Sequence, residues 1–126
     1  MKVLVSFVFL FVFGLSISAQ SPTDLFADGA KQVNAGQFDE ALRSYTMALA
    51  AAETRYADKN YRARLQYNIG VCYFHLDRFD LAVNHFKQAV LLKTDYALAY
   101  HALGVTKIRA QKLKGAASQL RAGFDK

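Results

Sequence analysis

The spacing of small and large residues constrains the fold of this chain more than any other feature of its sequence. Three glycines are each followed by an alanine twelve positions later, by a large apolar residue four further on, and by a small residue three beyond that. The three sets are Gly29, Ala41, Tyr45 and Ala48; Gly70, Ala82, Phe86 and Ala89; and Gly104, Ala116, Leu120 and Gly123. A recurring spacing of this kind indicates repeated units that bury their apolar faces by stacking on one another.

The glycines indicate how each unit is packed. A glycine within a helix costs about 1 kcal/mol relative to alanine, so three glycines in the same phase point to a packing requirement. We expect Gly70 to let one helix approach its partner closely, with Ala82 on the facing helix and Phe86 filling the space one turn further on. No segment alternates with period two over a useful length, so the predicted fold class is all-α, without a sheet.

These residues resemble the tetratricopeptide repeat (TPR), whose first helix carries Leu-Gly and Tyr and whose second carries Ala and an aromatic residue. The middle copy matches this pattern with Ile69-Gly70, Tyr73, Ala82, Phe86 and Ala89, but has Gln66 for the family's Trp and Thr94 for its Pro. The third copy keeps Tyr100, Leu103-Gly104 and Ala116, but has Lys107 for Tyr and Leu120 for the aromatic residue. The resemblance implies a TPR-like α-solenoid of three tandem antiparallel helix-turn-helix hairpins.

The predicted repeat domain spans residues 20–126, with units at about 22–57, 61–94 and 96–126. Within these units we expect helices at about 22–35, 38–57, 61–76, 79–92, 96–110 and 114–124. Ser21 and Asp24 have the spacing of an N-terminal cap, Asp58 or Asn60 and then Asp95 are expected to cap later helices, and Gly36 should stop the first helix.

Residues 1–19 differ in kind from the rest of the chain. Lys2 is followed by an unbroken apolar run from Val3 to Phe13 and then by small and polar residues, which is typical of a secretory signal peptide. The run is short for a membrane span, which needs roughly 20 residues. We therefore predict cleavage after Ala19, or alternatively after Ser18, and a periplasmic or secreted protein. The alternative is a protein anchored in the membrane by an uncleaved N-terminal segment.

The sequence offers little for catalysis, so we predict that the protein is not an enzyme and has no cofactor or metal. Cys72 is the only cysteine and is expected to be a small buried apolar residue on a helix, with an intermolecular disulfide as the alternative. His75, His85 and His101 are the only histidines. His85 is expected at the surface, whereas His75 and His101 fall on first helices of their hairpins, where they could lie near each other. A metal site would need a third ligand beside them.

Charge is unevenly distributed along the chain. From Lys107 onward there are six cations and one acid, Asp125, whereas residues 20–61 carry four cations and six acids. We interpret the basic end mainly as a solvated capping helix. Contact with an acidic partner or an anionic membrane surface is the alternative, and nucleic acid is not expected to be a partner of an exported protein.

The resemblance also implies a binding surface, because the first helices of successive TPR hairpins line a concave groove that takes an extended peptide or a partner helix. The residues expected to face this apolar groove are Phe26, Val33, Tyr67, Val71, Phe74, His75, Leu98, His101, Val105 and Ile108. The predicted function is therefore that of an exported, non-enzymatic adaptor, scaffold or complex subunit that binds an unidentified protein or peptide. One alternative is that part of this surface is packed by the segment next to the signal peptide, by a neighbouring chain or by the third hairpin. The other is that the protein forms homo-oligomers by stacking through its repeat ends.

Overall fold

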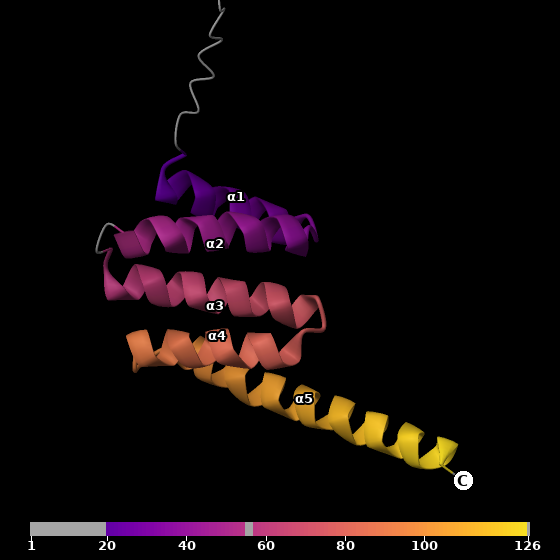
Figure 1. Ribbon diagram of the computed structural model, residues 1–126. Helices are drawn as coiled ribbons and strands as arrows, with labels where there is room; N and C mark the ends of the chain where they lie inside the picture. The colour runs from indigo at the N-terminus through magenta and orange to yellow at the C-terminus, as the bar shows by residue number, and fades with distance from the viewer. Residues whose placement is uncertain (1–19, 55–56, 126) are drawn as a thin grey trace, which may run out of the picture.

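The computed structural model describes residues 20–54 and 57–125, and every regular element in these two ranges is an α-helix. The helices are α1 (Pro22–Asn34), α2 (Phe38–Thr54), α3 (Lys59–His75), α4 (Phe79–Leu92) and α5 (Ala97–Phe124). Figure 1 shows α1 to α4 stacked in chain order as antiparallel layers, with α5 against α4. The all-α prediction is confirmed.

The ends of α1 follow from its sequence. The Ser21 side chain accepts a hydrogen bond from the backbone N–H of Asp24 (3.1 Å), and the Asp24 carboxylate accepts one from the backbone N–H of Ser21 (3.3 Å). These two bonds satisfy donors that the helix leaves free, and Pro22 fits the first turn because its missing N–H is not needed there. At the other end Gly36 adopts a left-handed φ of 73°, as expected for a stop.

The later caps are less regular than predicted. Asp58 does precede α3, but its side chain makes no capping hydrogen bond. The prediction for Asp95 was wrong, because α5 begins at Ala97 and Tyr96 occupies the N-cap position. Both helices therefore begin without a capping side chain, and packing against the preceding helix stabilises them instead.

The first two hairpins pack as the spacing predicts. A Cβ atom added to Gly29 would lie 2.7 Å from Cε1 of Tyr45, and one added to Gly70 would lie 2.7 Å from Cε1 of Phe86. Both rings are almost fully buried, with exposures of 2% and 1%. Each glycine therefore provides the space that an aromatic ring of the facing helix fills.

The core continues between the hairpins, where α2 packs on α3. Its members come from three helices and are Leu25, Ala41, Tyr45, Ala48, Ala52, Leu65, Ile69 and Cys72. Cys72 is fully buried, as expected for a small apolar residue, and burial raises the pKa of its thiol to about 11. The thiol is therefore protonated at neutral pH.

The third unit departs from the prediction, because α5 is one continuous helix of 28 residues where two helices were expected. The turn of each formed hairpin contains a left-handed residue, Gly36 (φ 73°) or Asp77 (φ 59°). The expected turn at residues 111–113 reads Gln-Lys-Leu, and none of these residue types favours that conformation. As a result nothing lies within 4 Å of a Cβ placed on Gly104, and Leu120 is 66% exposed.

None of the five helices combines the length and the apolar character needed to cross a membrane. The predicted signal peptide, residues 1–19, lies outside the described residues. That prediction and the predicted cleavage site therefore stay predictions.

The contrast between Gly70 and Gly104 predicts opposite effects of the same substitution. Gly70→Ala forces a Cβ into the buried Phe86 ring, and overpacking of this kind costs about 1–3 kcal/mol, which outweighs the gain in helix propensity. Gly104→Ala meets no neighbour and should stabilise the protein by up to about 1 kcal/mol. Urea unfolding monitored by circular dichroism measures both changes. Equal effects of the two substitutions would contradict the packing described here.

Candidate partner-binding groove

A cavity of about 240 Å³ opens between α3 and α5, and Phe86 of α4 also lines it. Six of the residues predicted to face the groove line this cavity, namely Tyr67, Val71, Phe74, His75, His101 and Val105. The remaining lining residues are Phe86, Ala102 and Thr106. The structure therefore gathers residues of the second and third units into one apolar hollow.

Helical spacing explains why these side chains share a hollow. The four residues on α3 are separated by four, three and one positions, which places them on one face of the helix. On α5, His101 and Val105 are one turn apart and Ala102 and Thr106 repeat that spacing one position later. Because α5 packs on α4, this side of α5 lies beside α3.

Aromatic contacts hold the walls of the cavity in place. Tyr67 lies against Phe86 (5.7 Å between ring centroids) and against Tyr96 (5.3 Å). Phe74 meets Phe79 edge to face at 5.4 Å, and the guanidinium carbon of Arg109 lies 5.8 Å from the Phe74 ring centroid. Aromatic and cation–π contacts of this kind add stability beyond the area they bury, so they help to hold the wall residues in position.

The histidines at the cavity have no metal-binding geometry. His75 stacks on Phe38 with ring centroids 4.3 Å apart, and it lines the same hollow as His101, as the sequence suggested. No group of three or more His, Cys, Asp or Glu side chains that could hold a metal ion occurs in the part of the chain that the structure describes. Both histidines are thus part of the lining of this hollow.

Two predicted groove residues of the first unit do not reach the cavity. Phe26 packs edge to face on Tyr45 (5.5 Å) and against Tyr61 (6.0 Å), while the Arg64 guanidinium covers its ring at 4.9 Å. Val33 is part-buried against the core. Helical periodicity carried no information about the side chains that cover these two residues.

Two predicted residues of the third unit also lie outside the cavity. Leu98 is 61% exposed near the start of α5. Ile108 is 55% exposed and lines a separate hollow with residues of α4, including Asp80 and Val83. The cavity thus occupies only the middle of the predicted groove.

Three lining residues were missed by the sequence analysis. The sequence analysis assigned Phe86 to the core. Its ring belongs both to the core, where one edge meets Gly70, and to the lining of the cavity. Thr106 is fully buried and donates a hydrogen bond from Oγ1 to the Ala102 carbonyl (2.6 Å). The repeated spacing from His101 and Val105 was the signal that would have found Ala102 and Thr106.

The expectation that His85 is a surface residue was wrong. His85 is half-buried against α3, where Nδ1 is hydrogen-bonded to Oε1 of Gln66 (2.8 Å) and the ring stacks on Tyr73 (5.3 Å). Gln66 stands where the family pattern has Trp, and this shorter polar side chain gives the histidine a partner. Burial lowers the pKa of His85 below its ordinary value of 6.5.

The chain matches the family model described as "Tetratricopeptide repeat" over residues 33–95. RNA polymerase II-associated protein 3 from Homo sapiens is 30% identical over 103 residues, which cover 82% of this chain and 14% of that protein. The Xenopus laevis protein of the same name is 31% identical over 88 residues, covering 70% of this chain and 12% of that protein. The chain therefore belongs to the tetratricopeptide repeat family, whose repeats are protein–protein interaction units. It spans about one seventh of the human relative's length.

The burial of His85 predicts a pH dependence of stability. The unfolded chain binds this proton more tightly than the folded protein, so stability is fully present above pH 6.5 and falls as the pH drops through 6.5 towards the lower folded pKa. Thermal unfolding of the protein and of His85→Gln should show a shallower decline for the variant over this window. His101→Gln, at an exposed position, is the control, and equal slopes for the protein and His85→Gln would contradict the assignment.

Proposed function

We propose that this protein is a non-enzymatic interaction module whose groove between α3 and α5 binds an apolar segment of a partner protein. The single observation that carries the proposal is the cavity formed by Tyr67, Val71, Phe74, His101 and Val105. The partner segment is a peptide or a helix that inserts a large apolar side chain between α3 and α5.

The size of the cavity supports a side chain as its occupant. Pockets for small molecules and cofactors usually measure about 300–1,000 Å³, so a hollow of about 240 Å³ is small for one. A Leu, Phe or Trp side chain fits a space of this order. Preformed apolar pockets that take one such anchor contribute most of the affinity of many protein interfaces.

The chemistry of the site supports a role without catalysis. Cys72 is the only thiol of the chain, and its burial and raised pKa make it a poor nucleophile. Arg109, the cation beside the cavity, lies over the Phe74 ring at 5.8 Å. Its charge can orient an acidic or carbonyl group of the bound segment near the edge of the cavity.

We also propose that the protein is exported, with residues 1–19 removed as a signal peptide. The support is the sequence pattern of a basic start, an apolar run and small residues before Gln20. The association with RNA polymerase II that the relatives' name states belongs to those much longer proteins. An exported chain would meet partners in the periplasm or outside the cell.

The groove proposal predicts that filling the cavity blocks binding. Peptides selected from a random displayed library on the protein should carry a large apolar anchor residue. They should bind Ala102→Leu at least about tenfold more weakly, because the added methyl groups occupy the space of the anchor. Circular dichroism checks that the variant keeps its helices, and Leu91→Ser, at a 71% exposed position of α4, is the matched control. Peptides that bind both variants equally would contradict the proposal.

The export proposal predicts the mass of the mature protein. Expression of residues 1–126 in a Gram-negative bacterium, followed by separation of periplasm from cytoplasm, should give a periplasmic chain that begins at Gln20. Intact-mass spectrometry measures the start point, and a chain beginning at Ala19 would support the alternative site. An uncleaved chain in the membrane fraction would support the anchor, and an uncleaved chain in the cytoplasm would contradict export.

A further inference from the structure

One apolar stripe runs along the whole of α5 with alternating gaps of four and three residues. Its members are Ala99, Leu103, Thr106, Ala110, Leu113, Ala117, Leu120 and Phe124. Gaps of four and three keep residues on one side of a helix and are the spacing used for packing against a second helix. The stripe is therefore one continuous face of α5 that runs from Ala99 to Phe124.

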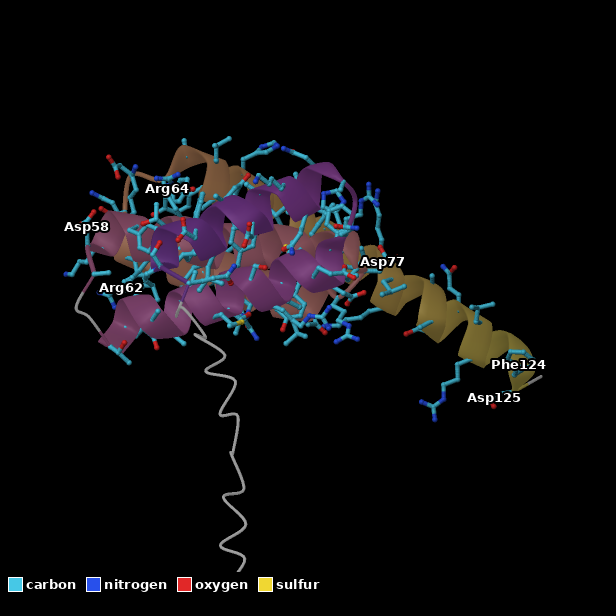
Figure 2. The ribbon with its side chains drawn as sticks, turned by 90° about the horizontal axis from the view of Figure 1, so that it is seen from above. Asp58, Arg62, Arg64, Asp77, Phe124 and Asp125 are labelled. Atoms are coloured by element: carbon cyan, nitrogen blue, oxygen red, sulfur yellow. The ribbon has the colours of Figure 1, made fainter. Side chains whose placement is uncertain are left out.

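The burial of this stripe changes abruptly along the helix. Ala99 and Thr106 are 0% exposed, because this half of α5 packs on α4. Leu113, Leu120 and Phe124 are 56%, 66% and 88% exposed. Figures 1 and 2 both show that the C-terminal part of α5 extends beyond the stacked helices, and Figure 2 shows Phe124 at its far end. The second half of the stripe therefore has the pattern of the packed half without a helix against it in the structure.

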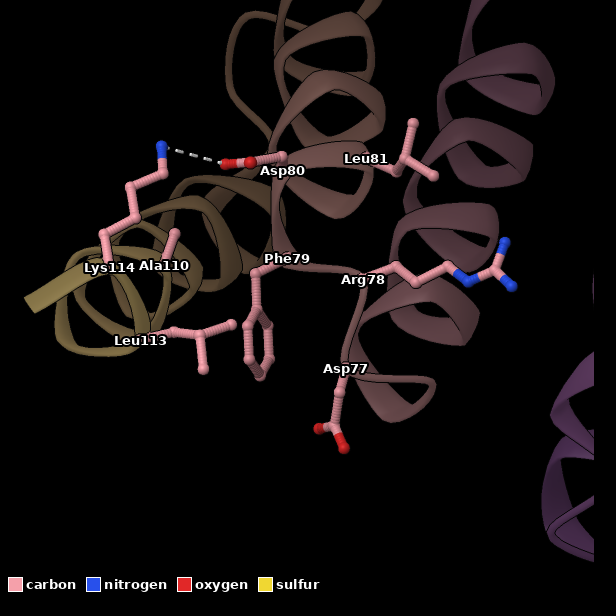
Figure 3. Close-up of a pocket in the computed structure, with 8 residues that line it drawn as sticks. All are labelled: Asp77, Arg78, Phe79, Asp80, Leu81, Ala110, Leu113 and Lys114. Atoms are coloured by element: carbon pink, nitrogen blue, oxygen red, sulfur yellow. Dashed lines mark ion pairs between the residues drawn. The ribbon is translucent and has the colours of Figure 1, made fainter. Parts of the chain in front are cut away.

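The transition occurs at Leu113. Figure 3 shows Leu113 and Ala110 beside the ring of Phe79, at the beginning of α4, where these residues line a hollow. Phe79 is the first residue of α4, and past Leu113 and Lys114 the stripe extends beyond the end of that helix (Figure 1). A continuous face with apolar residues at this spacing is typical of a helix that receives a partner helix.

The charges beside the stripe indicate the chemistry of that partner. Lys107, Lys114 and Arg121 follow one another at seven-residue intervals, each directly after a stripe residue, so they form one flank. Residues 97–124 contain no acidic side chain. One member of this flank already meets an acid within the protein, since Nζ of Lys114 lies 3.4 Å from Oδ1 of Asp80 on α4 (Figure 3).

A second copy of the same helix does not fit this flank. An antiparallel pair would place the flank of Lys114 and Arg121 against its own equivalent, and a parallel pair would place it against the other flank, which contains Arg109, Ala116 and Gly123. Neither arrangement offers an acid, and like charges that face each other disfavour pairing.

We propose that residues 110–124 of α5 dock an amphipathic helix of a partner protein, which carries an apolar stripe of its own flanked by Asp or Glu side chains. The acids pair with Lys114 and Arg121, and the apolar residues cover Leu113, Leu120 and Phe124. A shallow hollow between Leu120 and Phe124, which Ala116 and Gly123 also line, receives one of them. This surface is separate from the groove between α3 and α5, so the proposal does not depend on the function proposed above.

The test uses three synthetic helical peptides of about three heptads. The first has Leu at the stripe positions and Glu on both flanks, the second replaces every Glu with Lys, and the third has the composition of the first with its stripe scrambled. Fluorescence anisotropy of each labelled peptide with the protein measures binding. We expect binding of the first peptide alone, and weaker binding at high salt because the flank contacts are exposed.

Variants at exposed positions keep the test independent of folding. Leu120→Ser combined with Phe124→Ser should weaken binding of the Glu peptide by about tenfold or more, since the peptide can no longer bury these two apolar side chains. Lys114→Glu combined with Arg121→Glu should transfer the preference to the Lys peptide. Leu91→Ser on α4 and Ala102→Leu in the groove should leave binding unchanged, which separates this surface from the groove.

Four outcomes would overturn the proposal. Equal binding of the Glu and Lys peptides would show that charge plays no part, and equal binding of the scrambled peptide would show that charge acts alone. Binding of none of the peptides would show that the stripe is not a docking surface. A dimer in sedimentation velocity that Leu120→Ser dissociates would assign the stripe to a second copy of the chain.

Discussion

The contact between a buried aromatic ring and a helical glycine is the interaction on which the rest of the structure depends. Tyr45 and Phe86 each occupy the volume that a Cβ on the facing glycine would need, so the two helices of each hairpin approach closely. The Phe86 ring also contacts Tyr67 and lines the cavity between α3 and α5. The side chain that fixes the distance from α3 to α4 thereby also fixes the depth of the groove. A change in this packing would alter the binding surface even though it occurs in the core.

Repeat spacing and turn-forming residues explain why the first four helices could be predicted and why the third hairpin was predicted wrongly. The positions of the first four helices followed from the repeat spacing and from signals such as Ser21, Asp24 and Gly36. The prediction of a third hairpin was wrong because the spacing of Gly104, Ala116 and Leu120 is compatible with a hairpin but does not by itself produce a turn. A turn needs a residue that tolerates positive φ, as Gly36 and Asp77 do, and residues 111–113 contain none. The absence of a turn residue was visible in the sequence, and it outweighs the repeat spacing.

The groove could be predicted only in part, because helical periodicity gives the direction in which a side chain points and not what it meets there. The direction was sufficient for Tyr67, Val71 and Phe74, whose surroundings belong to the best-matching repeat. It was insufficient for Phe26, which Tyr45, Tyr61 and Arg64 cover, because those contacts come from other helices. The same limit explains His85, whose half-buried position depends on Gln66 of the neighbouring helix.

The geometry of α5 allows both proposed surfaces to be used at once. His101 and Val105 face the groove, whereas Leu113, Leu120 and Phe124 form the exposed part of the stripe. At 100° per residue these two sets point about 100° apart around the helix. The stripe is anchored on α4 through its first half, so a helix docked on its second half would extend the stack without covering the cavity. A segment bound in the groove would contact α3, Phe86 of α4 and the proximal half of α5. One long helix can therefore join two partners of different chemistry, an apolar anchor in the groove and an acidic helix at the far end. Because α5 is continuous through residues 111–113, the two proposed sites lie apart along the molecule.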